Sequence, residues 1–518
     1  MRKLVLTLAA MASLSASAQY PAVRAEYIME NHRALVHGEG LQPFAVEGLK
    51  QQLDEMRIQR RNARKAPLKA VAPLLTTLWA QDSPYNRLLP STGSFWGSST
   101  LTGCVATSTA QVLNFFEYPK ASIGKGRYST DGKNYRSVST ATTFDWKNMA
   151  DRYTLGYSEA QAKAVAELMR DCGYAASMIY TSSGSGTTAY DAGYGLVHNM
   201  QYDSLSLKVP TRMFYHDKDW KEMIYAELQA GRPVVYDAVD PSNGMGHSFV
   251  FDGMDAEGKV HVNWGWAGDA NGYYDIDNLS PSYSDMYGQV YRYNFTGEAR
   301  MIIGFKPQAT PDPDEQYESF FAMQEKDSMW VGKDSVYLKQ TPIYNFSNLC
   351  FNGLLGIVVE GEDGHGVVQP FFYSPWNQND EIPYLGGLYP TQCYFPSATL
   401  CDTDGKTPRP DGTYYLYLVS WAKQEMSGGL NPQYVRIPAN CVGDDEENIG
   451  VWEAEIVGGH WDPKSFRRYK VKKEETSIVK IGDDNRSSMK GTFDLSGRRA
   501  DNDAKGLLIK NGKKVLVK

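Results

Sequence analysis

The chain has 518 residues, of which 42% are hydrophobic and 22% are charged, a balance typical of globular proteins. This length exceeds that of one ordinary domain, so we expect two or three folded domains together with processing segments. The formal net charge of −7 gives no sign of a nucleic-acid-binding surface, and we expect no nucleic-acid partner.

The first 18 residues have the pattern of a secretory signal peptide. Arg2 and Lys3 precede an apolar run over residues 4–14, and residues 16–18 supply the small side chains of a cleavage site. A membrane anchor is the weaker interpretation, because the run is shorter than the ~20 residues needed to span a bilayer. We therefore expect no integral membrane segment, and a protein that is secreted or attached to the outer cell surface.

Residues 19–70 are predicted to form a pro-segment. Val46, Leu49, Leu53 and Met56 recur at helical spacing, which predicts one amphipathic helix. A basic cluster follows, and it is either the solvated end of this helix or an exposed linker that is cut during activation. The cluster consists of Arg57, Arg60, Arg61, Arg64, Lys65 and Lys69.

Residues 71–306 contain the richest motifs and are predicted to form an α+β domain. Helical patterns come first and end at stop signals such as Pro119 and Gly173. Strand patterns follow, so we expect a helical subdomain and a later antiparallel sheet. The predicted helices cover residues 104–117, 158–171 and 217–230, and the predicted strands cover residues 233–239, 248–251, 259–263 and 272–276.

The C-terminal part is predicted to be rich in β-strands. Residues 307–316 form a linker of proline and acidic residues. From 317 to 470, turn residues separate short alternating runs, for example at residues 335–338, 354–360 and 413–420, which predicts an Ig-like β-sandwich.

Six cysteines are present, and an exported protein permits disulfides. If Cys104 is a free nucleophile, at least one further cysteine is unpaired. No Cys-x-x-Cys or His-Glu-x-x-His spacing occurs, so we expect no metal site and no other cofactor. The six are Cys104, Cys172, Cys350, Cys393, Cys401 and Cys441, of which Cys393 and Cys401 are nearest in the sequence.

Cys104 is the candidate catalytic nucleophile. Ala106, Ala110 and Leu113 follow at the spacing of one helical face, which places Cys104 at the N-terminus of a helix. The positive end of the helix dipole and the unpaired N–H groups there favour the thiolate, the reactive form. The alternative is a buried, inert cysteine, the usual state of a lone one.

His247 is the candidate proton carrier. It follows Gly246 at the start of a hydrophobic strand, and a turn at residues 255–258 brings the chain back so that residues 262–266 lie close to the histidine. A thiolate needs an imidazole as its ion-pair partner and as proton donor to the leaving amine. His261 is a competitor, but its flanking valines make it an ordinary strand residue on the opposite face.

Three further residues complete the predicted catalytic set. Asn263 can supply the acceptor that orients the imidazole, and Trp264 can shield that contact. Gln81 is the third, since acyl transfer develops an oxyanion that needs preorganised donors. Its side-chain amide and the N–H of Cys104 would provide two donors; the alternative is a surface glutamine.

These motifs resemble the streptopain family of papain-like cysteine peptidases, in particular interpain-type members from Bacteroidetes. The resemblance covers residues 70–306. It implies a papain-like, two-subdomain peptidase followed by the β-sandwich. The matching segments are residues 74–81, 83–86, 102–107, 110–112, 118–119, 246–250, 252–253, 262–266 and 271–274.

The resemblance implies roles for individual residues. Cys104 is implied as nucleophile, His247 as its partner, Gln81 as an oxyanion donor and Trp264 as the indole packed beside the histidine. The substrate-binding residues that we predict on this basis are Ser182, Ser183, Gly246 and Trp266.

Two residues depart from the family pattern. Ser248 stands where the family usually has a small residue after the histidine, often alanine, and Ala267 replaces a glycine that is common after the second tryptophan. Neither change removes a catalytic group.

The last residues carry a second resemblance. Residues 475–518 are similar to C-terminal sorting tails of secreted Bacteroidetes proteins, which implies export past the outer membrane or surface attachment. The alternative is a small β-hairpin that closes the sandwich, since Asn511 and Gly512 supply a type I′ turn between two strand signals.

We therefore predict a secreted cysteine endopeptidase that is made as a zymogen. Its partners would be protein and peptide substrates, and its own pro-segment as inhibitor. A second hypothesis is a surface protein of weak catalysis that binds host proteins through its β-sandwich. A third is a transferase that passes acyl groups to amines with the same thiol and imidazole.

Overall fold

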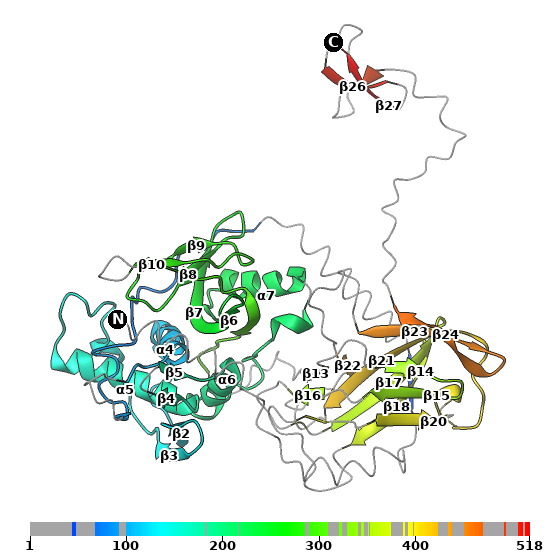
Figure 1. Ribbon diagram of the computed structural model, residues 1–518, viewed down its shortest axis with the longest axis horizontal. Helices are drawn as coiled ribbons and strands as arrows, with labels where there is room; N and C mark the ends of the chain where they lie inside the picture. Colours follow the sequence, from blue (N-terminus) through cyan, green and yellow to red (C-terminus); the bar gives the residue numbers. More distant parts are fainter. Residues whose placement is uncertain are drawn as a thin grey trace. The chain divides into compact units, whose positions relative to one another are not determined.

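The computed structural model describes the peptidase-like part of the chain almost without gaps, together with separate strands of the C-terminal part (Figure 1). The described residues are 44–47, 68–92, 100–181, 184–215, 217–284, 290–308, 321–323, 329–339, 343–345, 351, 353–373, 387–388, 392–396, 398–402, 404–422, 434–437, 450–469, 492–493, 506–510 and 513–517. The predicted signal peptide lies outside them. No helix among these residues is long and apolar enough to cross a membrane.

Four helices form the first part of the domain. The three predicted helices are present as α4 (Cys104–Phe116), α5 (Glu159–Ala175) and α7 (Asp217–Gln229). Helix α6 (Ala189–His198) escaped prediction because Gly193 and Gly195 weaken its helical pattern. Helix α5 begins at a capping box in which the Ser158 side chain accepts from the Gln161 N–H, which satisfies a donor that the helix leaves unpaired.

The second part is a five-stranded antiparallel sheet in the order β12-β6-β7-β8-β9. All four predicted strands belong to it. Their bounds are β6 (Val234–Asp240), β7 (Met245–Met254), β8 (Val260–Asn263) and β9 (Gly272–Tyr274), and β12 (Gly297–Ile302) completes the sheet. Helices before an antiparallel sheet confirm the predicted α+β class.

Helix α4 packs against this sheet, on strands β6 and β7 (Figure 1). Ten of its residues, from Cys104 to Leu113, are buried, so the helix lies inside the domain instead of covering its surface. A smaller four-stranded sheet flanks the helices, in the order β3-β2-β4-β5. Its strands are β2 (Lys125–Ser129), β3 (Tyr135–Ser139), β4 (Ile179–Thr181) and β5 (Gly184–Gly186).

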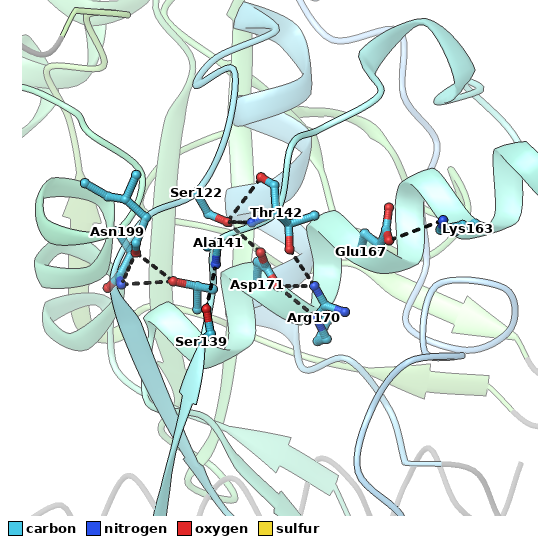
Figure 2. A network of polar contacts seen from close by, with 11 residues as sticks. Ser122, Ser139, Ala141, Thr142, Lys163, Glu167, Arg170, Asp171 and Asn199 are labelled. Carbon is cyan, nitrogen blue, oxygen red and sulfur yellow. Dashed lines mark hydrogen bonds and ion pairs between the residues drawn. The ribbon is translucent and has the colours of Figure 1, made fainter.

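A buried carboxylate on α5 fixes the helical part (Figure 2). Asp171 is fully buried, accepts a hydrogen bond of 2.6 Å from the Ser122 hydroxyl and pairs with Arg170. Arg170 also donates to the Thr142 hydroxyl at 2.7 Å, while Ser122 and Thr142 are joined through their main chains. The network therefore ties α5 to two loop segments that precede it by about 30 and 50 residues.

We expect the Asp171→Ala variant to lose about 3–5 kcal/mol of unfolding free energy, because it leaves a partly buried arginine and a buried hydroxyl without their acceptor. Glu167→Ala is the matched control on the same helix. It breaks only the partly exposed Lys163–Glu167 pair in Figure 2 and should cost less than about 0.5 kcal/mol. Urea denaturation of both variants measures the difference, and equal losses would contradict the role of Asp171.

The C-terminal part contains two packed layers of strands. One is a seven-stranded sheet with β18 (His365–Tyr373), β17 (Gly353–Gly361), β21 (Gly412–Ala422) and β23 (Val451–Val457) at its centre. The other includes β14 (Met329–Val331), β15 (Ser335–Lys339) and β20 (Gln392–Pro396). Side chains of both layers, such as Leu338 and Ile357, share one buried apolar cluster. This arrangement confirms the predicted β-sandwich.

The pro-segment differs from its prediction at one point. Val46, taken as the first residue of an amphipathic helix, lies in strand β1 (Phe44–Glu47), which pairs antiparallel with β18. The ladder with β18 satisfies this strand's backbone groups, so pairing overrides the weak helical pattern. Leu49, Leu53 and Met56 lie outside the described residues.

Residues 470–518 form a second compact unit. Strands β26 (Gly506–Lys510) and β27 (Lys513–Val517) pair so that Lys510 faces Lys513, which leaves two residues for the predicted turn. Strand β25 (Thr492–Phe493) pairs with β26. Whether this unit serves as a sorting tail stays a prediction.

Candidate active site

The nucleophile candidate opens helix α4, as the sequence predicts. Gly103 precedes Cys104 with φ +87°, a conformation that L side chains rarely adopt. A Cβ at this glycine would also lie 2.9 Å from the Met178 side chain. The segment before it is held by a hydrogen bond from the Thr102 N–H to the Gln81 carbonyl, so the two donors predicted for the oxyanion lie on connected segments.

His247 lies on β7 among aromatic rings. Its imidazole stacks on Trp266 at 4.8 Å between ring centroids and lies 5.4 Å from the ring of Phe295. Its Nε2 is 2.9 Å from the main-chain oxygen of Trp264. Because a carbonyl can only accept, this nitrogen carries the hydrogen, and the neutral ring leaves Nδ1 as a bare acceptor.

The Cys104 thiol and the His247 imidazole are not hydrogen-bonded to each other. Nε2 is engaged by Trp264, and Nδ1 is buried without any hydrogen-bond partner. The thiol instead receives main-chain N–H groups, one of them from Ser248.

Burial dominates the ionisation of both groups. It raises the pKa of the Cys104 thiol to about 12, with a further increase from the negative charge of Asp237. N–H groups at the start of α4 lower this pKa, but by less. The helix terminus therefore favours the thiolate, as the sequence predicts, but desolvation outweighs this effect in the described structure. Burial also lowers the pKa of His247 to about 4, against a smaller opposing effect of the Trp264 carbonyl.

We expect the full-length chain to react slowly with iodoacetamide at Cys104, because only the thiolate attacks. With a pKa near 12, the rate at pH 8 should be at least about a hundredfold below that of the urea-unfolded chain and should rise about tenfold per pH unit up to pH 10. Mass spectrometry of the Cys104 peptide measures this rate. The partly exposed, free Cys401 provides an internal reference, and reaction at Cys104 as fast as at Cys401 would contradict the buried thiol.

Asn263 does not orient the histidine in this structure. Its amide donates to the Thr77 carbonyl at 2.8 Å, and its oxygen accepts from the Gly265 N–H at 3.1 Å. The orienting acceptor is the neighbouring Trp264 carbonyl, since the aromatic stack holds the imidazole on that side. Trp264 itself is fully buried and stacks parallel to the imidazole at 6.3 Å, beside the histidine as the resemblance implies.

Gln111 on α4 lies in one of the segments that match the family, but no role was predicted for it from the sequence. Its fully buried side-chain oxygen accepts from the Thr77 hydroxyl at 3.0 Å and from the Trp79 N–H at 3.3 Å. The amide groups of Gln111 and Asn263 also exchange hydrogen bonds. One glutamine therefore joins the nucleophile helix, the segment that leads to Gln81, and the end of β8. The sequence signals for it were an amide at a predicted helix position and the family match over residues 110–112.

We expect Gln111→Ala and Asn263→Ala each to cost about 2–4 kcal/mol of stability, because each leaves buried partners without hydrogen bonds. The double variant should lose at least about 1 kcal/mol less than the sum, since both deletions break the same contacts. Chemical denaturation of the four proteins gives this coupling energy. Strict additivity would show that the two amides act independently.

The remaining predicted residues fall into two groups. Gln81 is partly buried, and its side-chain oxygen has no hydrogen-bond partner. Gly246 pairs with Val239 on β6, directly before the histidine, and Trp266 stacks on the imidazole. Ser182 and Ser183 lie outside the described residues. Among the described residues, no group of three histidine, cysteine or acidic side chains could hold a metal ion.

The two departures from the family pattern have structural consequences. Ser248 is buried, and its hydroxyl lies 2.8 Å from that of Ser108 on α4, which is a contact that an alanine cannot make. Ala267 has φ +58°, in the left-handed region that glycine adopts more easily. This conformation explains why a glycine is common at that position.

Residues 79–274 match the sequence profile of the Peptidase C10 family. The chain is 41% identical to active interpain A of Prevotella intermedia, with 46% of this chain and 95% of that chain covered and a TM-score of 0.41. The chain belongs to the Peptidase C10 family. Cys104, His247 and Trp264 all lie within the matched segment.

Other relatives of this C10 peptidase extend the comparison. A prointerpain A fragment is 37% identical, with 51% and 84% of the two chains covered and a TM-score of 0.40. Streptopain of Streptococcus pyogenes is 32% identical over 44% of this chain, and the thiol protease/hemagglutinin PrtT of Porphyromonas gingivalis is 31% identical over 55%. The chain spans 60% of streptopain and 33% of PrtT.

Proposed function

We propose that this chain is the precursor of a secreted endopeptidase and that the described structure corresponds to its resting state. The observation that carries the proposal is the arrangement of the two catalytic candidates. Cys104 contacts β7 at Ser248, one residue from His247, yet the imidazole is hydrogen-bonded to Trp264 and not to the thiol. A site with both groups buried on adjacent elements, but not hydrogen-bonded to each other, has the parts for catalysis without the active geometry.

Activation requires His247 to leave the Trp264 carbonyl and to present its bare Nδ1 to the thiol. Proton transfer from Cys104 to Nδ1 would then give a thiolate–imidazolium pair, in which each charge compensates the burial of the other. Neither ion is favoured alone, since burial raises the pKa of the thiol and lowers that of the imidazole. Forming the pair is therefore the step that separates the resting chain from the active enzyme.

In the active enzyme, the Cys104 sulfur attacks the carbonyl carbon of a peptide bond. Negative charge develops on the carbonyl oxygen, where the Cys104 N–H and the Gln81 amide would donate hydrogen bonds. The imidazolium gives its proton to the leaving amine, and an acyl-enzyme forms. The imidazole then removes a proton from water, which attacks the thioester and releases the acid.

The partners in this proposal are protein substrates and the chain's own pro-segment. The relatives include a prointerpain fragment, which supports a pro-form for this chain as well. The basic residues 57–69 lie between strand β1 and the peptidase domain and supply sites for cleavage by a trypsin-like activity. Export follows from the predicted signal peptide.

We expect the purified chain to shorten itself under reducing conditions and then to cleave casein. Cys104→Ala should stay at full length and inactive, with activity at least about 10³-fold lower, because it lacks the nucleophile. Cys172→Ala is the matched control, since Cys172 is also a buried, free thiol, and it should process normally. Gel analysis and casein hydrolysis measure both steps.

Trypsin added in trans removes the pro-segment independently of self-processing. A trypsin-cut wild type that cleaves no protein would overturn the peptidase proposal. Equal casein cleavage by trypsin-cut Cys104→Ala would overturn the assignment of the nucleophile alone.

A further inference from the structure

A partly buried carboxyl group beside the nucleophile has no part in the reaction derived above. Asp237 lies on β6, directly across from Ser248 on β7 and from Arg300 on β12. The Ser248 hydroxyl donates to the Asp237 carboxylate, and the Ala189 N–H at the start of α6 also donates to it. One carboxylate oxygen is buried without a hydrogen-bond partner.

Proton counting connects this carboxylate to the nucleophile helix. Each serine hydroxyl has one proton. When Ser248 donates to the Asp237 carboxylate, its oxygen can accept from Ser108, whose hydroxyl lies 2.8 Å away and shares its one proton with the Val105 carbonyl at 3.1 Å. Ser108 is one turn along α4 from Cys104 and is buried. The chain Asp237–Ser248–Ser108 therefore links β6 and β7 to α4, directly behind the thiol.

We propose that Asp237 is a positioning residue of the catalytic centre. Acting through Ser248 and Ser108, it fixes the helix that carries Cys104 against the strand that carries His247, and it keeps a carboxyl group beside the resting thiol. The link depends on the hydroxyl of Ser248, the position at which the family usually has a small residue such as alanine, so it is a feature of this chain.

The charge of the carboxyl gives the proposal a measurable consequence. Burial raises the pKa of Asp237 to about 6, while Ser248, Arg300 and the Ala189 N–H act in the opposite direction. The groups that face this carboxyl are therefore Arg300 from β12, Ser248 from β7, the Ala189 N–H from α6 and the Cys104 thiol from α4. Above pH 6 the carboxylate opposes ionisation of the thiol, and below pH 5 it is protonated and the opposition ends.

The test is the rate of Cys104 alkylation by iodoacetamide as a function of pH, in full-length protein whose intact mass is checked. Asp237→Asn removes the charge but keeps the shape, so its alkylation should be several-fold faster than wild type at pH 7–9 and equal to it below pH 5. Asp237→Glu keeps the charge and should restore the wild-type profile.

The Ser248→Ala variant tests the link itself. Loss of the donated hydrogen bond should raise the pKa of Asp237. The pH at which the Asp237 charge begins to slow Cys104 alkylation should therefore move above 6. Asp252→Asn is the matched control. It changes a second carboxyl, which is buried on β7 and pairs with His261, and it should leave Cys104 alkylation unchanged.

An Asp237→Asn profile that follows wild type at every pH would overturn the proposal, and so would an equal effect of Asp252→Asn. A purely structural role for Asp237 would lower the melting temperature without changing the pH profile. If Asp237→Asn does not fold, the wild-type protein provides the test. Its rate of Cys104 alkylation must rise by less than tenfold per pH unit near pH 6, where Asp237 ionises. The proposal rests on Cys104 as the nucleophile, but alkylation needs no peptidase activity, so its failure is distinct from failure of the proposed function.

Discussion

The contact between the N-terminus of α4 and strand β7 is the constraint on which the site depends. It places the Cys104 thiol at the main-chain N–H of Ser248, one residue from His247. Two polar links hold this contact from either side. Gln111 joins α4 to Thr77, Trp79 and Asn263, and Ser108 joins it to Ser248. Because these links are buried, a polar group that loses its partner destabilises the fold, which favours a single arrangement of helix and strand.

The same burial that defines this geometry suppresses the chemistry. Inside the domain neither a thiolate nor an imidazolium is stable alone, and the aromatic rings around His247 stabilise its neutral form. A peptidase needs this environment, because a dry site strengthens the interactions that stabilise the transition state. It also needs a compensating partner for each charge. In the resting state that we propose, the Trp264 carbonyl holds the imidazole and so withholds this partner.

Elements outside the peptidase domain are organised on different principles. The β-sandwich is held by an apolar cluster between two sheets, and strand β1 of the predicted pro-segment joins it through backbone pairing with β18. Backbone pairing depends little on side-chain identity. The short, weakly patterned sequence of residues 44–47 could therefore be taken for the start of a helix.

The sequence by itself determined the fold class and the identity of the chemical groups. In the described part of the peptidase domain, periodicity and stop signals located three of the four helices, strand patterns located four of the five strands of the larger sheet, and the motifs around Cys104 and His247 indicated a cysteine peptidase. These signals are local, because helix and strand periods are written in neighbouring residues.

Tertiary structure alone decided how the groups relate. It assigned the orienting acceptor to the Trp264 carbonyl instead of Asn263, because a main-chain oxygen carries no sequence signature. It set the balance at Cys104, where desolvation outweighs the N–H groups of the helix terminus, since desolvation depends on everything packed around the thiol. It also brought Asp237, Ser248 and Ser108 together from three separate elements. Distances between residues remote in the chain are set by packing, which no local pattern contains.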